Sequence, residues 1–230
     1  MDLENSIEER CSVRHYKDKG VEKEKLVKVL NAGRLSPSSG NIQNWAFVVV
    51  DDNEKKKMIC DACNQDWMLD APVFIVILGD EKKAVEYYGE RGEKLYTIEN
   101  CSMAAQNMML EAVSLGLGSC FVAAFIDEKI IEIINAPSHM RPIGIITLGY
   151  PKGNIDKDEK KGRDSLYSKV YFNKYGEKIK DFDMFNYNVL GRTLNRAKKV
   201  GNRIKKRIGE KKNSLEKTFF LLVNEKPIIM

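Results

Sequence analysis

The sequence predicts an α/β or α+β fold, in which a β-sheet is covered by helices. Short apolar runs rich in β-branched residues alternate with segments of helical periodicity, which is typical of strands connected by helices. The hydrophobic fraction of 43% is sufficient for a buried core. No uninterrupted apolar stretch reaches the ~18 residues that a membrane-spanning helix needs. The composition is therefore that of an ordinary globular protein.

The first elements are expected to be a helix, a turn and a strand. Residues 21–34 show helical periodicity, with apolar side chains on one face. Residues 36–41 are predicted to form a turn, because serine, proline, glycine and asparagine favour turn geometry. Residues 45–50, with the sequence Trp-Ala-Phe-Val-Val-Val, then predict a buried strand.

Helices and strands continue to alternate along the rest of the chain. The segment 97–115 predicts the most apolar helix, which is hydrophobic on almost all sides. Such a helix is buried on several sides or lies at a subunit interface. The other expected elements are a helix at 54–63, strands at 72–78, 119–125 and 143–148, and a helix at 127–134.

The N-terminus and the cysteines point to a cytoplasmic protein. The first residues are acidic and polar, without the basic start and apolar run of a secretory signal. Five irregularly spaced cysteines are a poor disulfide framework. Cys60 and Cys63 have the C-x-x-C spacing of a redox pair or of half a zinc site. Since they fall inside a predicted helix and have no second pair close by, we favour a structural role and expect no metal.

The positive charge is concentrated near the C-terminus. Residues 189–217 contain eleven basic and two acidic residues, a net charge of +9, so the rest of the chain carries −4 of the total of +5. Apolar residues recur at helical spacing among these basic residues. Such a basic amphipathic stretch could bind an anionic membrane or nucleic acid. We favour docking on a mildly acidic partner subunit.

Arg10, Ser12 and Arg14 form a candidate phosphate site. In an extended segment these alternate residues point to the same side. Two guanidinium groups and one hydroxyl suit a phosphate, because arginine forms bidentate charge-assisted hydrogen bonds with its oxygens. A solvated basic turn is the structural alternative.

Two small-residue segments are further candidates for ligand binding. Residues 37–43 combine short polar side chains with the exposed backbone N–H groups of a turn. Gly116 and Gly118 end the apolar helix and would let a flat ligand approach the backbone that follows. Either segment alone also fits an ordinary loop. Because the sequence has no G-x-G-x-x-G and no phosphate loop, a Rossmann nucleotide site or an ATPase is not supported.

Taken in order, these segments resemble the nitroreductase-like family of FMN-dependent oxidoreductases. That family has an Arg-x-Ser-x-Arg/Lys start, a Pro-Ser-Ser-x-Asn-x-Gln-x-Trp turn, an Ala-Ala-Gln-Asn helix core before Gly-Leu-Gly, and a Leu-Gly-Tyr-Pro strand end. The resemblance covers about residues 4–176. The matching residues are Arg10, Ser12, Arg14, Pro37, Ser38, Ser39, Asn41, Gln43, Trp45, Ala104, Ala105, Gln106, Asn107, Leu148, Gly149, Tyr150 and Pro151.

The resemblance implies an α+β nitroreductase-like fold, with a central, mainly antiparallel sheet flanked by helices. It also implies a homodimer with a long central helix at the interface. FMN is expected at that interface, with Ser39 and Asn41 reaching the site of the partner subunit. Residues 1–176 would form the FMN-binding domain, and residues 177–230 a basic C-terminal extension that docks on the dimer.

The site residues implied by the resemblance hold the flavin, and none is assigned as catalytic. The backbone N–H near Ala123 is expected to meet flavin N5. Some family members carry a lysine at the position of Trp67, so Arg14 is a candidate for the positive charge near the flavin ring. Asn100 stands where family members frequently carry aspartate. The expected cofactor-binding residues are Arg10, Cys11, Ser12, Arg14, Pro37, Ser38, Ser39, Asn41, Gln43, Asn64, Phe121, Val122, Ala123, Ala124, Lys161 and Arg163.

The implied reaction is a ping-pong hydride transfer from NADH or NADPH, through FMN, to a nitroaromatic, quinone or similar small acceptor. Tyr87, Tyr88 and Arg91 are candidates for contacting that acceptor, although they equally fit an ordinary surface helix. Alternatives are a flavin-modifying or dehalogenating relative and a non-catalytic flavin-binding module. A further alternative is a protein whose basic tail binds membrane or nucleic acid. With only His15 and His139 and no nucleophile motif, a triad hydrolase is not indicated.

Overall fold

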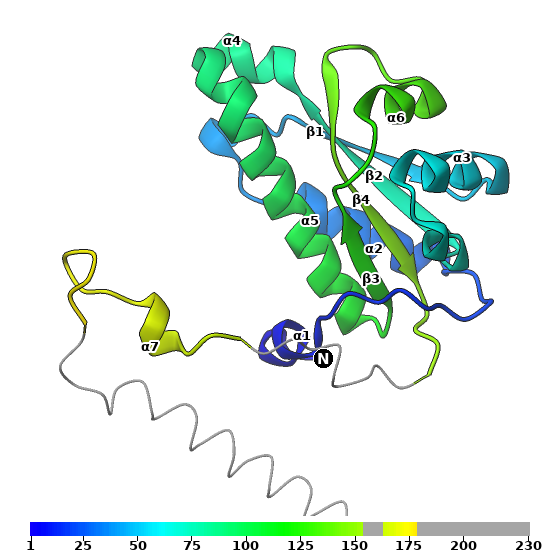
Figure 1. Ribbon diagram of the computed structural model, residues 1–230, viewed down its shortest axis with the longest axis horizontal. Coiled ribbons are helices and arrows are strands. Elements are labelled where there is room, and N and C mark those ends of the chain that lie inside the picture. The colour runs from blue at the N-terminus through cyan, green and yellow to red at the C-terminus, as the bar shows by residue number, and fades with distance from the viewer. Residues whose placement is uncertain (154–162, 179–230) are drawn as a thin grey trace, which may run out of the picture. The chain divides into compact units, whose positions relative to one another are not determined.

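The computed structural model of the chain describes residues 1–153 and 163–178 (Figure 1). It separates into two compact units, Met1–Lys161 and Gly162–Met230, and each is described by itself. The predicted basic segment 189–217 and Lys161 lie outside the described residues. The domain boundary at residue 176 and the docking of the extension on a dimer stay predictions.

The first unit contains a four-stranded sheet with the order β1-β2-β4-β3, in which every neighbouring pair is antiparallel. β2 and β4 are therefore the inner strands, and β3 is an edge strand (Figure 1). This arrangement confirms the predicted α+β fold with a mainly antiparallel sheet. The strands are β1 (Trp45–Val50), β2 (Val73–Asp80), β3 (Gly118–Val122) and β4 (Met140–Gly149).

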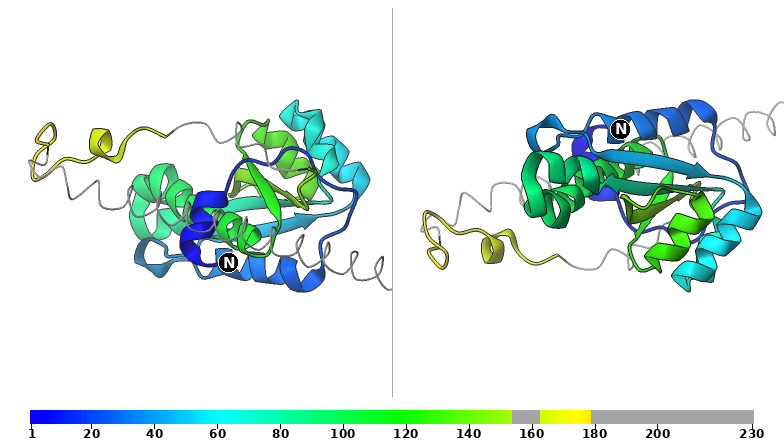
Figure 2. Two further views of the ribbon diagram at one scale, coloured as in Figure 1. Left: turned by 90° about the horizontal axis from the view of Figure 1, so that it is seen from below. Right: turned by 90° about the horizontal axis from the view of Figure 1, so that it is seen from above.

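Helices cover both faces of this sheet (Figure 2). Phe74 and Val76 of β2 pack with α3 (Asn53–Cys63) and α6 (Asp127–Ile134) on one face. Ile75 and Ile77 point to the other face, against the following two helices. These are α2 (Lys23–Arg34) and α5 (Thr97–Ser114). A strand buried on both faces needs apolar side chains at every position, which explains the continuous apolar run of β2.

The predicted helices and strands agree with the structure, with shifted ends. The largest differences are in two strands. β3 ends at Val122 instead of residue 125, with the two following alanines exposed, and β4 begins at Met140 instead of residue 143. The strand expected to be buried at 45–50 is a half-buried edge strand in which only Val50 is buried.

α4 (Glu81–Arg91) is the surface helix that was one of the two interpretations of Tyr87, Tyr88 and Arg91. α1 (Leu3–Glu9) and the π-helical turn η3 (Gly92–Tyr96) were not predicted. A 3-10 turn, η2 (Asp66–Asp70), follows α3.

A polar cluster joins the start of α2 to the end of β4. The Tyr150 hydroxyl donates a hydrogen bond of 2.6 Å to the Glu22 carboxylate and accepts one of 2.8 Å from Lys25 Nζ. The Lys19 ammonium lies 3.2 Å from Glu22 and 4.0 Å from the centre of the Tyr150 ring. These contacts lower the pKa of Glu22 from 4.5 to about 2, with the Tyr150 hydrogen bond as the largest cause.

This cluster predicts an acid-dependent part of the stability. Since the pKa of Glu22 is lower in the folded chain, its contribution is complete above about pH 4.5 and is lost as the pH falls toward 2. The urea midpoint of the wild type should therefore fall more between pH 5 and pH 2 than that of Glu22→Gln. An equal fall in both proteins would contradict the prediction.

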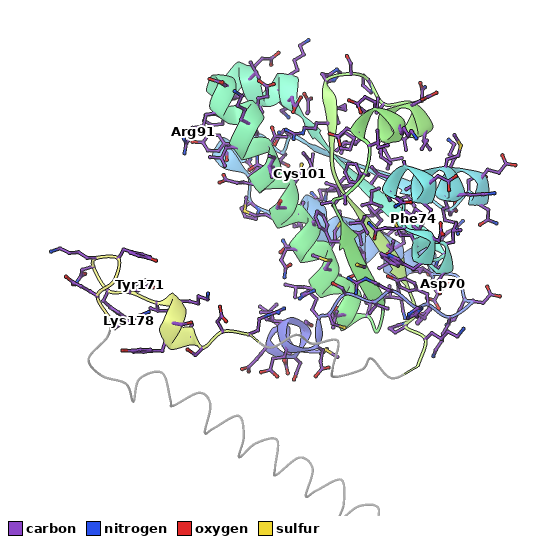
Figure 3. The ribbon with its side chains drawn as sticks, in the orientation of Figure 1. Asp70, Phe74, Arg91, Cys101, Tyr171 and Lys178 are labelled. Atoms are coloured by element: carbon purple, nitrogen blue, oxygen red, sulfur yellow. The ribbon has the colours of Figure 1, made fainter. Side chains whose placement is uncertain are left out.

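The described part of the second unit contains one short helix, α7 (Leu166–Lys169), and a turn that folds back on it. Lys178 Nζ donates hydrogen bonds to the carbonyls of Tyr167, Ser168 and Val170, at 2.7, 3.0 and 3.3 Å. The same ammonium lies 3.7 Å from the centre of the Tyr171 ring (Figure 3). Lys178 thus caps the C-terminal carbonyls of α7. Among the residues described in both units, no helix has the length and apolarity needed to span a membrane.

Candidate functional site

The segment from Arg10 to Arg14 leaves α1 and runs beside the edge strand β3. Ser12 pairs with Ser119 of β3 in parallel orientation, and the Val13 N–H donates a hydrogen bond of 3.0 Å to the Ser119 carbonyl. Cys11 and Val13 are buried, whereas Ser12 is half-buried and Arg14 exposed. We name Arg10, Ser12 and Arg14 the arginine claw. Their alternation follows from the extended backbone of this segment.

Tyr16 fixes the end of the arginine claw to the sheet. Its buried hydroxyl donates to the Val13 carbonyl at 2.6 Å and lies 2.7 Å from Thr147 Oγ1 of β4. Burial raises the pKa of the Tyr16 hydroxyl far above its ordinary value, so this group stays a neutral donor. Further along, the Lys17 N–H donates to the Tyr150 carbonyl at 2.8 Å. The segment is thus held by both β3 and β4.

Gly118 allows this close approach. A Cβ atom on Gly118 would lie 2.8 Å from Val13 Cγ2, 2.9 Å from Val13 Cβ and 3.0 Å from Pro151 Cγ. The sequence left open whether this glycine pair admits a flat ligand or simply ends a helix before a strand, and in the structure the Val13 side chain of the claw segment packs against Gly118. The glycine therefore has a packing role that brings the claw to the edge of the sheet.

Gly118→Ala is expected to push the claw segment away from β3. Val13 is β-branched and stiff, so the added methyl group should destabilise the fold by about 1–3 kcal/mol and also weaken FMN binding. Urea unfolding and a flavin fluorescence titration would measure the two effects. Gly20→Ala is the control, since nothing lies within 4 Å of a Cβ there. Equal stability of the two variants would refute the packing role.

The charges of Arg10 and Arg14 both act on Cys120, in the middle of β3. Burial raises the pKa of the Cys120 thiol, while the charge of Arg14, a hydrogen bond with Ser12 and the charge of Arg10 all lower it. Both guanidinium groups thus act on one point of the strand. The Arg14 guanidinium also lies 5.7 Å from the ring centre of Trp67, whose indole N–H donates to Gln65 Oε1 at 3.0 Å. Trp67, at the position where some family members carry lysine, therefore offers an aromatic face to Arg14.

Ser119 supplies the test of whether an anionic cofactor fits here. Its residue is 2% exposed, and its hydroxyl has no hydrogen-bond partner among the described residues. A buried hydroxyl without a partner is unfavourable, and a ligand oxygen would satisfy it. Because Ser119 is paired with Ser12 of the claw, the residues present fit a phosphate or polyol group. Sequence reasoning missed Ser119, although it directly follows the Gly-Leu-Gly motif.

We name residues 38–41 the serine loop. Its backbone is irregular and is stabilised by local hydrogen bonds. Ser38 Oγ accepts a hydrogen bond of 2.9 Å from the Gln43 N–H, and Gln43 Nε2 donates to the Asn41 carbonyl at 3.2 Å. Asn41 and Gln43 have positive φ angles of 58° and 47°, and both are exposed. Pro37 is exposed as well. The loop therefore presents polar side chains at the surface.

The serine loop and the arginine claw lie at opposite ends of α5. The Ser39 N–H donates to Asn100 Oδ1 near the start of α5, at 2.9 Å. The claw instead pairs with β3, which follows directly after the end of α5 at Ser114. Asn100 and Ser114 are 14 positions apart on α5, which corresponds to roughly 20 Å of helix. One protomer therefore does not bring these two predicted parts of the site together.

The other predicted site residues fall into three groups. Asn64 ends α3 in left-handed conformation and has an exposed side chain. Val122 is buried and the Phe121 ring packs over Gly144, so these two side chains belong to the core. Ala123 and Ala124 follow the strand and are exposed. Arg163 lies in the second unit, which is described by itself.

Comparison with known proteins assigns the family. A sequence profile described as the Nitroreductase family matches two overlapping segments, residues 7–63 and 57–150, which together span more than half of the chain. The chain belongs to the nitroreductase family. The match includes the arginine claw, the serine loop, α5 and the Leu-Gly-Tyr end of β4, and it confirms the resemblance read from these motifs.

The alignments of this chain with individual relatives cover most of the length of each relative. A provisionally named NADH dehydrogenase/NAD(P)H nitroreductase from Archaeoglobus fulgidus is 33% identical over 152 residues, 64% of this chain and 84% of that protein. An FMN reductase (NADPH) from Bacillus subtilis is 26% identical over 188 residues, covering 74% and 76%. The solved structure of an FMN-dependent nitroreductase from Clostridium difficile is 34% identical, with a TM-score of 0.63 and coverage of 74% and 98%.

In this nitroreductase the C-x-x-C pair lies in the core. Cys60 and Cys63 are both buried and free, on the α3 face of the sheet. Burial raises the pKa of the Cys60 thiol to about 12 and that of Cys63 to about 11. Both thiols are therefore protonated and weakly nucleophilic at neutral pH, as the structural interpretation of this pair implies.

The acceptor candidates of this nitroreductase form an aromatic cluster on α4 and η3. The rings of Tyr88 and Tyr96 meet edge to face with centres 5.1 Å apart, and Tyr87 is 63% exposed. Arg91 Nε donates to the Tyr96 hydroxyl at 2.9 Å. A Cβ on Gly40 of the serine loop would lie 2.0 Å from the Tyr88 hydroxyl. The cluster thus packs against the serine loop of the same protomer.

Proposed function

We propose that this chain oxidises NADH or NADPH and passes the electrons to a nitroaromatic, quinone or similar small acceptor in a ping-pong sequence, as a homodimer. It is an FMN-dependent NAD(P)H oxidoreductase of the nitroreductase family. The single observation that carries the site is the buried, unpartnered hydroxyl of Ser119, which is paired with Ser12 of the arginine claw.

When bound, FMN supplies hydride acceptance and donation at its N5 atom. The protein's task is to bind and orient it. Arg10 and Arg14 neutralise the phosphate through charge-assisted hydrogen bonds, and the hydroxyls of Ser12 and Ser119 donate to its oxygens or to the polyol. The exposed backbone at Ala123 is proposed to lie along the reactive edge of the flavin.

The homodimer is proposed because one protomer holds the claw and the serine loop at opposite ends of α5. A second copy would bring the serine loop of one protomer to the claw of the other. Apolar side chains on the packed helices α1 and α5 are exposed and suit such an interface. They are Leu3 (67%), Ile7 (57%), Ile98 (37%) and Met103 (36%).

Light scattering during size-exclusion chromatography should give about twice the chain mass of 26.3 kDa. Ile7→Glu together with Met103→Glu is expected to yield monomers that lose FMN. A wild-type monomer that retains stoichiometric FMN would overturn the two-protomer site.

The decisive test of the proposed function is flavin reduction. Purified protein, supplemented with FMN where needed, should show flavin absorbance that bleaches on anaerobic addition of NADH or NADPH. Steady-state rates with a quinone or nitroaromatic should then give parallel double-reciprocal lines. Absence of flavin binding overturns the proposal, and binding without reduction would instead indicate a non-catalytic flavin module. Intersecting lines would exclude the ping-pong sequence.

Free FMN belongs in the same acceptor panel. The Bacillus subtilis relative is named an FMN reductase (NADPH), which favours flavin as a second candidate acceptor. Turnover of free FMN at rates above those for quinones and nitroaromatics would assign that activity to this chain.

A further inference from the structure

A buried polar network occupies the junction of β1, β2 and α5. Asn44 is 1% exposed, and Thr97 and Asn100 are fully buried. Asn100 Nδ2 donates to Asn44 Oδ1 at 2.8 Å, and Asn44 Nδ2 donates to Thr97 Oγ1 at 3.0 Å and to the Asp80 carbonyl at 3.2 Å. Each member has partners, and such fully paired networks are rigid because any broken bond leaves a buried polar group unpaired.

The two ends of this network reach two parts of the surface. At one end, Asn100 Oδ1 accepts hydrogen bonds from the Ser39 N–H at 2.9 Å and from Ser39 Oγ at 3.3 Å. At the other end, Thr97 Oγ1 donates to the Gly92 carbonyl at 2.9 Å, at the start of η3. The network therefore connects the serine loop to the segment that carries the aromatic cluster.

A second contact joins the same two parts. The Tyr88 hydroxyl lies directly over Gly40, where a Cβ would be only 2.0 Å away. Between Tyr88 and η3 the helix is interrupted at Gly89, whose φ of 57° and ψ of −148° are readily adopted only by glycine. The segment from α4 to η3, which carries Arg91 beside the upper part of α5 in Figure 3, is therefore a broken helix that depends on its contacts for its position.

We infer that Asn100, with Asn44 and Thr97, is a positioning residue that fixes the serine loop and the α4–η3 segment relative to each other. The inference rests on the proposed function in one respect, namely that the serine loop binds FMN. The serine loop, which would contact the flavin, and the aromatic cluster, which would contact the acceptor, would then form one rigid unit.

Asparagine suits this position better than a carboxylate. Its oxygen accepts from Ser39 while its amide nitrogen donates to Asn44, so both sides are satisfied. An aspartate could still accept from Ser39 but would place a charge at a fully buried site and face the oxygen of Asn44. The need for an amide that both donates and accepts is consistent with asparagine at residue 100, where other family members frequently carry aspartate.

The test compares Asn100→Ala with Cys101→Ala in the full chain. Both residues lie on α5 and are fully buried, but Cys101 packs in the apolar core (Figure 3). NMR-detected hydrogen exchange of the Ser39 amide, without FMN, should accelerate about tenfold or more in Asn100→Ala. In Cys101→Ala it should stay within about twofold of the wild type. FMN affinity should fall in the first variant only.

Two further variants make the outcome unambiguous. Asn100→Asp retains the acceptor for Ser39 but loses the donor to Asn44, so the protection of the Ser39 amide should lie between that of the wild type and that of Asn100→Ala. Where Asn100→Ala is too unstable to study, Thr97→Val takes its place. Thr97→Val removes only the hydroxyl at the η3 end, and it should still accelerate exchange at Ser39, which is 58 residues away in the sequence.

Failure of this inference is distinguishable from failure of the proposed function. If the wild type binds no FMN, the function fails, while the exchange of the Ser39 amide still decides whether Asn100 positions the loop. If the wild type binds FMN but Asn100→Ala and Thr97→Val leave Ser39 exchange as in Cys101→Ala, the inference alone is overturned.

Discussion

Replacing Arg14 by alanine is expected to weaken FMN binding about tenfold to a hundredfold, and Arg10→Ala should act in the same direction. Hydrogen bonds to charged groups contribute about 1.5–3 kcal/mol each, which corresponds to this range of affinity. The charges of both guanidinium groups reach Cys120 in the middle of β3, and the two residues flank Ser12 on the same extended segment, so both are expected to bind the phosphate. Fluorescence titration of the apoprotein with FMN would measure the change.

Arg14→Lys separates charge from geometry. Lysine keeps the positive charge but loses both the planar fork and the stacking on Trp67, so an intermediate affinity is expected. Arg34→Ala is the control, since Arg34 is exposed on α2 and bonds only its neighbour Asn31 among the contacts seen. If Arg10→Ala and Arg14→Ala both bind FMN as tightly as Arg34→Ala, the claw is not the phosphate site.

The second large effect concerns the inner strand of the sheet. Phe74 is fully buried in β2, and Phe74→Ala should lower the free energy of unfolding by about 3–5 kcal/mol, because it removes apolar contacts and leaves a cavity. Domains of this kind have a total stability of about 5–15 kcal/mol, so this is a large share. Lys56 Nζ, which lies 6.0 Å from the centre of the ring, would also lose its aromatic neighbour.

Urea unfolding followed by far-ultraviolet circular dichroism would measure this loss. The matched control is Phe172→Ala in the second unit, where the side chain is 39% exposed and the change should be within about 1 kcal/mol. A loss of less than about 1.5 kcal/mol for Phe74→Ala would contradict the assignment of β2 as a strand buried on both faces.

Elements with a clear local pattern of apolar residues were predicted well, and elements without such a pattern were not. β2 was predicted because apolar residues lie at nearly every position, and burial on two sides requires that pattern. α5 was predicted from its long apolar helical pattern, which ends at Gly116 and Gly118. The end of β3 was placed three residues too late, since Ala123 and Ala124 are apolar although they lie exposed beyond the last pair. The broken helix from α4 to η3 was not predicted, because charged and aromatic residues alternate there without a clear period.

From the sequence alone we could predict all four strands, most of the helices, the alternation of Arg10, Ser12 and Arg14, and the family. Each of these depends on residues that are close along the chain, so periodicity and motif order are sufficient to detect them. The tertiary structure was needed to show that the Val13 side chain packs against Gly118 and that Asn100 holds Ser39. These contacts join residues 61 or more positions apart, so they are set by packing and not by any local pattern.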